Sequence, residues 1–111
     1  MSRDFLPKPF RCDVTTVDGT ARVRPLGELD MSTVGVLGER LRAAHAAGAS
    51  RLVVDLRELE FMDSTGLTLL TRWSLGAEQD GYAFALVPGS QRIQRLFELT
   101  GLAPRFTFER G

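Results

Sequence analysis

The chain has 111 residues, of which 43% are hydrophobic and 25% are charged, as expected of one compact domain with its own core. Its 14 basic and 14 acidic side chains cancel, so no net field favours nucleic acid or an anionic membrane as a partner. The single cysteine, Cys12, excludes an internal disulfide and a multi-cysteine metal site, and we expect it to be a small buried strand residue.

No apolar run approaches the ~20 residues that are needed to span a bilayer. Residues 1–10 alternate charged, proline and aromatic side chains, unlike the apolar region of a secretion signal. We therefore expect a cytoplasmic protein with two parts: a flexible N-terminal segment at residues 1–9 and one folded domain at residues 10–111.

The first part of the domain predicts a β-hairpin. Residues 10–17 are β-prone, and Asp18-Gly19 is a dipeptide that is favoured in tight hairpin turns. Residues 21–26 continue as the second strand, which we end near Pro25 because proline removes a donor from the ladder.

A helix follows from Ser32, where the apolar residues become spaced three and four apart. Asp30 or Ser32 is expected to cap its N-terminus, and Gly48 is expected to end it. The apolar face of this helix consists of Val34, Leu37, Leu41 and Ala44.

Residues 51–56 form a nearly continuous apolar run, which predicts the central strand of the sheet, covered on both faces. A loop at residues 58–63 then leads into a second helix, which begins at Ser64 and stops near Asp80. Leu75 falls on the side of this helix that we expect to be exposed.

The last part of the chain predicts a strand, a helix and a short strand. Residues 82–87 are apolar, Ser90 is expected to cap a helix that stops at Gly101, and residues 105–109 alternate as the final strand. This order of elements predicts an α/β fold: a single domain with a mixed β-sheet of about five strands and three or four helices packed against it.

One run of six residues stands out between the predicted central strand and the second helix. It consists of Phe61, Met62, Asp63, Ser64, Thr65 and Gly66. Open α/β sheets place functional groups at this carboxyl edge, and in a connecting loop we expect neither apolar side chain to be fully buried. A helix N-terminus also favours an anion, so the fold would tolerate a phosphate on Ser64, and the modification would change only the surface.

The alternative is purely structural: Asp63 or Ser64 merely caps a helix, and Gly66 permits close packing of that helix on a strand. Spacing alone favours this alternative, because Asp-Ser pairs are common at helix starts. Glu28 and Asp30, at the preceding strand-to-helix junction, also have two interpretations: a paired acid site or partner contact, or a loop residue and a helix cap.

The sequence matches no enzyme template. It has no Gly-x-Ser-x-Gly elbow and no phosphate-binding or dinucleotide-binding fingerprint. The only histidine, His45, is expected to be a solvated residue of the first helix. Arg92 and Arg95 are expected to lie on a solvated face of the third helix, which could meet an acidic patch. We therefore expect no enzymatic activity, no cofactor and no metal site.

Four blocks together resemble one family, the STAS domain (sulfate transporter and anti-sigma factor antagonist), and within it the stand-alone bacterial anti-sigma factor antagonists. They are residues 27–30 (GELD), 52–56 (LVVDL), 61–67 (FMDSTGL) and 95–102 (RLFELTGL). The resemblance implies that an anti-sigma factor with serine-kinase activity phosphorylates Ser64. It implies that the unphosphorylated form binds this kinase and frees a sigma factor, and that a metal-dependent serine phosphatase reverses the modification.

The resemblance also implies that five residues lie in or beside the binding surface: Glu28, Asp30, Asp63, Thr65 and Gly66. Thr65 would be a lesser phosphate acceptor. We also expect the partner to dock over Phe61, Met62 and Ser64, so these residues belong to the expected binding surface. We expect no nucleic-acid or membrane partner, and a monomer or weak homodimer. The alternative function is an STAS subunit of a signalling scaffold, or an accessory subunit of a lipid or anion transporter.

Overall fold

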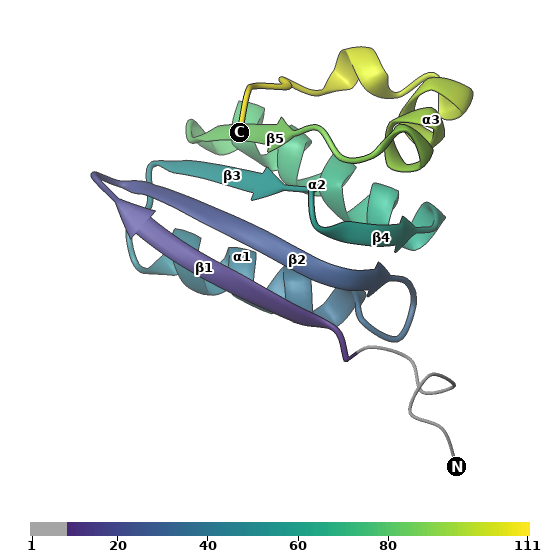
Figure 1. The fold of residues 1–111 in the computed structure, drawn as a ribbon. Helices are drawn as coiled ribbons and strands as arrows, with labels where there is room; N and C mark the ends of the chain where they lie inside the picture. The colour runs from purple at the N-terminus through teal and green to yellow at the C-terminus, as the bar shows by residue number, and fades with distance from the viewer. Residues whose placement is uncertain (1–8) are drawn as a thin grey trace.

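The computed structural model describes residues 9–111, so residues 1–8, most of the segment predicted to be flexible, lie outside the described residues. The described chain forms a five-stranded sheet with helices packed against it (Figure 1). The strands are β1 (Arg11–Val17), β2 (Thr20–Leu29), β3 (Arg51–Asp55), β4 (Leu59–Met62) and β5 (Ala83–Val87). The helices are α1 (Val34–Ala46), α2 (Ser64–Asp80), α3 (Gln91–Thr100) and a short 3-10 helix (Ala103–Arg105).

The sheet is mixed, in the order β1-β2-β3-β5, and β4 pairs with β2. β1 and β2 are antiparallel, joined by the predicted hairpin turn, in which Asp18 and Gly19 have φ angles of 51° and 79°. Both central residues at positive φ match the twist of the flanking strands. The other pairs are parallel, so their carboxyl ends meet at one edge of the sheet.

Strand β2 is longer than predicted because it has two parallel partners in succession. Residues 20–23 pair with β3 and residues 27–29 pair with β4. Pro25 lies between the two pairings, where a missing donor is tolerated, so the strand continues past it to Leu29. Residues 27–29, which we expected to follow the strand, are therefore the last paired residues of β2.

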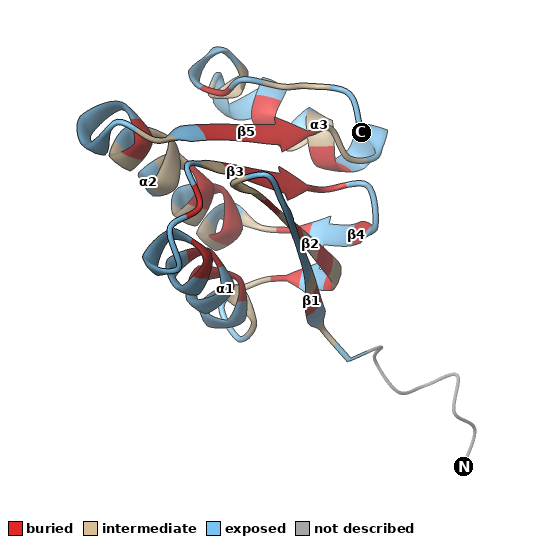
Figure 2. Ribbon diagram, turned by 90° about the vertical axis from the view of Figure 1, so that its left-hand side faces the viewer, coloured by how far each residue is buried: buried red, intermediate tan, exposed pale blue. Residues whose placement is uncertain are grey.

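Helices α1 and α2 lie on one face of the sheet, and α3 lies on the other side, beside β4 (Figure 2). β3 and β5 are largely buried, whereas most of β1 is exposed. The central position of β3, the exposure of Leu75 and the burial of Cys12 are confirmed. Burial raises the pKa of the Cys12 thiol to about 11, so this group stays protonated at neutral pH. None of the helices within residues 9–111 has the length and apolar composition of a membrane span.

Three further predictions differ from the structure. The loop expected at residues 58–63 contains β4, a strand of four residues that is too short for a clear alternation of side chains. The strand expected at residues 105–109 is only a single bridge between Phe108 and Leu86, because residues 103–105 turn as a 3-10 helix first. The N-cap of α1 is Thr33, not Asp30 or Ser32, because a turn bonded through Asp30 precedes the helix.

The face of the sheet opposite α1 and α2 carries a network of charges near β1 and β2. Asp55 is 1% exposed and accepts hydrogen bonds from Nε (3.0 Å) and Nη2 (2.7 Å) of Arg57, while Arg22 Nη1 lies 3.6 Å from Asp55 Oδ2. Burial alone would raise the pKa of the Asp55 carboxyl, but the hydrogen bonds and charge of Arg57 and the charge of Arg22 outweigh it. The pKa therefore lies below its ordinary value of 3.8.

The lowered pKa of Asp55 predicts a dependence of stability on acid. Its contribution is complete above the unfolded pKa of 3.8 and is lost as the pH falls toward and through the folded pKa. The Asp55→Asn variant should be less stable by about 1–2 kcal/mol at neutral pH. Its deficit should shrink as the pH is lowered to about 3. Urea unfolding over this range measures both, and a deficit that stays constant with pH would contradict the assignment.

Candidate functional site

The start of α2 holds Ser64 at the carboxyl edge of the sheet. The backbone N–H of Asp63 donates to the carbonyl of Leu29 (3.1 Å), which joins the end of β4 to the end of β2 immediately before the helix begins. Ser64 is the first residue of α2 and is exposed. Within residues 9–111 its hydroxyl has no hydrogen-bond partner, and only its backbone carbonyl is used, by Thr68 Oγ1 (2.8 Å). The Ser64 hydroxyl is therefore exposed and has no structural role among these residues.

Asp63 caps α2, as the structural interpretation of this run predicted. Its Oδ1 accepts from the backbone N–H groups of Thr65 (2.9 Å) and Gly66 (3.4 Å) and from the Thr65 hydroxyl. These are donors that the first turn of a helix otherwise leaves without partners. Asp63 therefore caps the helix, and the Ser64 side chain takes no part in the cap. The structural interpretation applies to Asp63, and the functional interpretation concerns Ser64.

Gly66 is where α2 touches the sheet. A Cβ at this position would lie 2.8 Å from both Leu29 Cδ2 and Met62 Cγ, so only glycine lets the helix approach this closely. Met62 itself is 6% exposed and points into the core. Our expectation that neither apolar residue of the run is fully buried is wrong for Met62, because β4 is a strand and successive side chains of a strand point to opposite faces.

Phe61 points the other way and is 39% exposed. In the register of β2 and β4 it lies beside Glu28, which is also exposed, just after a register shift at Gly27. An aromatic ring and a carboxylate thus stand next to each other at the sheet edge that leads to Ser64.

The loop from β2 to α1 forms the other border of the site. Asp30 Oδ1 accepts hydrogen bonds from the backbone N–H (2.9 Å) and the hydroxyl (2.7 Å) of Ser32. These bonds keep the pKa of the Asp30 carboxyl below its ordinary value, so it is ionised at neutral pH. Met31, which the sequence did not single out, is 79% exposed at the tip of this loop.

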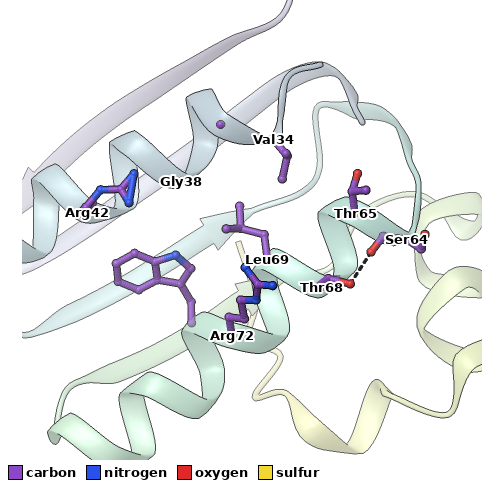
Figure 3. A pocket seen from close by; sticks show the side chains of 10 residues that line it. Val34, Gly38, Arg42, Ser64, Thr65, Thr68, Leu69 and Arg72 are labelled. Atoms are coloured by element: carbon purple, nitrogen blue, oxygen red, sulfur yellow. Dashed lines mark hydrogen bonds between the residues drawn. The ribbon is translucent and has the colours of Figure 1, made fainter. Parts of the chain in front are cut away.

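A groove between α1 and α2 opens from Ser64 (Figure 3) and was not predicted from the sequence. Its volume is about 390 Å³. It is lined by Val34, Gly35, Gly38, Arg42, Ser64, Thr65, Thr68, Leu69, Arg72 and Trp73. No local motif marks such a groove, because its walls come from two helices about thirty residues apart in sequence.

His45 is exposed, as predicted, and lies away from Ser64. It stands in the last turn of α1 and packs against the rings of Tyr82 and Trp73, at centroid distances of 4.5 and 6.2 Å. Arg92 and Arg95 lie on the exposed face of α3. The part of the chain that the structure describes brings together no group of three or more side chains able to hold a metal ion.

Comparison with known proteins gives a consistent family. A family model described as "Mlab, STAS domain" matches residues 12–105. An anti-sigma-B factor antagonist of Staphylococcus aureus (strain NCTC 8325 / PS 47) is 38% identical over 90 residues, which are 81% of this chain and 83% of that protein. The corresponding protein of Staphylococcus epidermidis is 36% identical over the same shares.

Two solved structures have the same fold. An anti-sigma factor antagonist from Mycobacterium paratuberculosis superposes with a TM-score of 0.77 at 29% identity, over 96% of this chain and 92% of that one. The Bacillus cell fate determinant SpoIIAA in its phosphorylated form gives a TM-score of 0.67 at 22% identity, over 91% of each chain. At that identity the second likeness concerns the fold alone.

The contacts of Gly66 predict the cost of a single methyl group at that position. Gly66→Ala should lower the free energy of unfolding by about 1–2 kcal/mol, because Leu29 and Met62 are buried and cannot easily move aside. Gly35→Ala is the matched control, since its Cβ would have no atom within 4 Å. That variant should gain up to about 1 kcal/mol from helix propensity. Urea denaturation compares them, and equal stabilities would show that the close approach is unimportant.

The cap of α2 predicts a second set of stabilities. Asp63→Ala should cost about 0.5–2 kcal/mol, whereas Asp63→Asn keeps an oxygen acceptor and should cost much less. Ser90→Ala removes the cap of α3, where Ser90 Oγ accepts from Ile93 N–H (3.3 Å), and should cost a similar amount. Thermal unfolding of the three variants tests this order. An Asp63→Ala variant as stable as the parent chain would contradict the role of Asp63 as the cap of α2.

Proposed function

This chain belongs to the STAS domain family and groups there with the anti-sigma factor antagonists, and we propose that it is a partner switch controlled by phosphorylation of Ser64. In the unphosphorylated state it binds an anti-sigma factor that is a serine kinase, and this binding releases a sigma factor. Phosphorylation ends the binding, and a metal-dependent serine phosphatase restores it.

The observation that carries this proposal is the contrast between two adjacent residues. Asp63 satisfies the first turn of α2, whereas the Ser64 hydroxyl is exposed and has no hydrogen-bond partner in residues 9–111. A serine that served only as a helix cap would have its oxygen occupied by backbone N–H groups. Ser64 thus presents a hydroxyl nucleophile at a fixed position, and its modification removes no hydrogen bond that the fold needs.

The modification itself is a phosphoryl transfer. The Ser64 oxygen forms a bond to the γ-phosphorus of ATP, the bond from that phosphorus to the β,γ-bridging oxygen breaks, and ADP leaves. The hydroxyl proton passes to a base of the kinase. This chain contributes the position of the oxygen, and the kinase supplies ATP, the metal ion and the base.

The phosphate is tolerated by the carrier. It brings roughly −1.5 to −2 charges and three acceptor oxygens to the N-terminus of α2, where the helix dipole favours an anion. The cap made by Asp63 does not involve the Ser64 side chain, so it persists. The same fold occurs in a Bacillus protein whose phosphorylated form has been solved, which supports this compatibility.

The partner is the component that the phosphate excludes. A protein docked over Ser64 and Phe61 would have to take the dianion out of water beside the carboxylates of Glu28, Asp30 and Asp63. Such a penalty reaches several kcal/mol at the dielectric of an interface. A loss of about 4 kcal/mol weakens binding roughly a thousandfold, which is sufficient for an on/off switch.

Substitution of Ser64 tests the switch. Ser64→Ala should bind the kinase as the parent chain does and should not be released by ATP, whereas Ser64→Asp should bind at least about a hundredfold more weakly. Ser50→Asp is the control, because Ser50 is also exposed but precedes β3, at the opposite edge of the sheet. Isothermal titration with the cognate serine-kinase anti-sigma factor measures all three, and unchanged affinity of Ser64→Asp would refute the proposal.

A further inference from the structure

The groove between α1 and α2 extends well beyond Ser64. Its far end is formed by Arg42, Arg72 and Trp73. A second hollow of about 240 Å³ shares Arg72 and Trp73 with it and continues to His45, Asp80 and Tyr82. The two together run along α2 from its first residue to the residue that follows its C-cap. At 1.5 Å per helical residue this is a path of roughly 25 Å.

Two glycines of α1 line the groove and leave different amounts of space. A Cβ on Gly38 would lie 3.6 Å from Leu69 Cδ1, so the two helices are in ordinary contact there. One turn earlier, a Cβ on Gly35 would meet no atom within 4 Å. The helices therefore touch at Gly38 and leave open space at Gly35, and Val34 and Leu69 are apolar residues that line this space.

The charge in the groove is opposite to the charge at its mouth. Arg42 on α1 and Arg72 on α2 both line the groove, from different helices (Figure 3). Arg72 forms no ion pair among the described residues, and Arg42 pairs only with Glu39 at the surface, where such a pair is worth little. The end at Ser64 lies next to the carboxylate of Asp63, which is bonded to the lining residue Thr65.

An unpaired arginine beside a tryptophan in a concave apolar surface is the composition of a binding hot spot. Trp73 is half-buried, so part of its ring is available to a ligand. Arg72 on the same helix can form two parallel hydrogen bonds with a carboxylate. Both features match a protein segment that carries an acidic residue next to an apolar one.

We propose that the α1–α2 groove holds an acidic, partly apolar segment of the same serine-kinase partner, with a carboxylate on Arg72 and an apolar side chain on Leu69 and Trp73. This inference rests on the proposed function and gives the partner a second contact, about two helical turns from Ser64. The kinase then recognises the chain through the groove and acts on it at the mouth.

Two pairs of variants test the groove by shape and by charge. Gly35→Leu fills the open space and should weaken kinase binding more than about tenfold, whereas Val36→Leu, on an exposed position outside the groove, should not. Arg72→Glu should also lose more than about tenfold, while Arg72→Lys should lose less and Arg40→Glu, outside the groove, should lose little. Far-UV circular dichroism confirms that each variant is folded.

The tryptophan content of the chain allows a direct readout. Trp73 is the only tryptophan, so 5-fluorotryptophan gives this chain a single fluorine resonance at the far end of the groove. Saturating kinase should shift the resonance in the parent chain and in Ser64→Ala, and Mg-ADP alone should leave it in place. A shift with Mg-ADP alone would overturn the proposal, because a small molecule would then occupy the groove.

The outcomes separate this inference from the proposed function. Tight kinase binding by both Gly35→Leu and Arg72→Glu, with an unmoved fluorine resonance, would overturn the groove contact and leave the Ser64 switch intact. Loss of binding in the groove variants, with Ser64→Asp still binding tightly, would support the groove and refute the switch. If the kinase does not bind the parent chain, both proposals fall.

Discussion

The position of Asp63 between β4 and α2 determines the geometry of the whole site. Its backbone N–H is bonded to the carbonyl of Leu29 at the end of β2, and its carboxylate holds the first turn of α2. The sheet edge and the helix start are therefore fixed relative to each other at one residue. A helix held in this way can present the next side chain, Ser64, to a partner without moving. Such a site favours regulation by covalent modification over regulation by a conformational change.

The distribution of small and charged residues gives this surface two different regions. Near the sheet edge, Phe61 and Glu28 stand side by side, and Asp63 ends the same edge. Between the helices, Gly35 leaves open space in a groove that Arg72 also lines. A chain with zero net charge thus separates its charges locally, so its neutral total excludes broad attraction to polyanions but leaves room for specific electrostatic recognition.

Sequence reasoning succeeded where one local rule decides the structure. The Asp18-Gly19 turn, the Ser90 cap and the left-handed Gly101 (φ 72°) each follow from a dipeptide or a single residue. It failed where a distant partner decides: β4 exists because β2 continues past Pro25, and Met62 is buried because β4 is a strand. The run around Ser64 was recognisable, but the division of work between Asp63 and Ser64 needed the hydrogen bonds.

The hydrogen bond from the Thr65 hydroxyl to Asp63 makes two neighbouring hydroxyl groups unequal. A phosphate on Thr65 would remove that donor and set a dianion against the carboxylate that holds the first turn, so esterification there would loosen the helix it sits on. Only one of the two alcohols can carry the group without structural damage. Phosphorylation at Ser64 alone, as we propose it, would give each molecule two states, unmodified and phosphorylated.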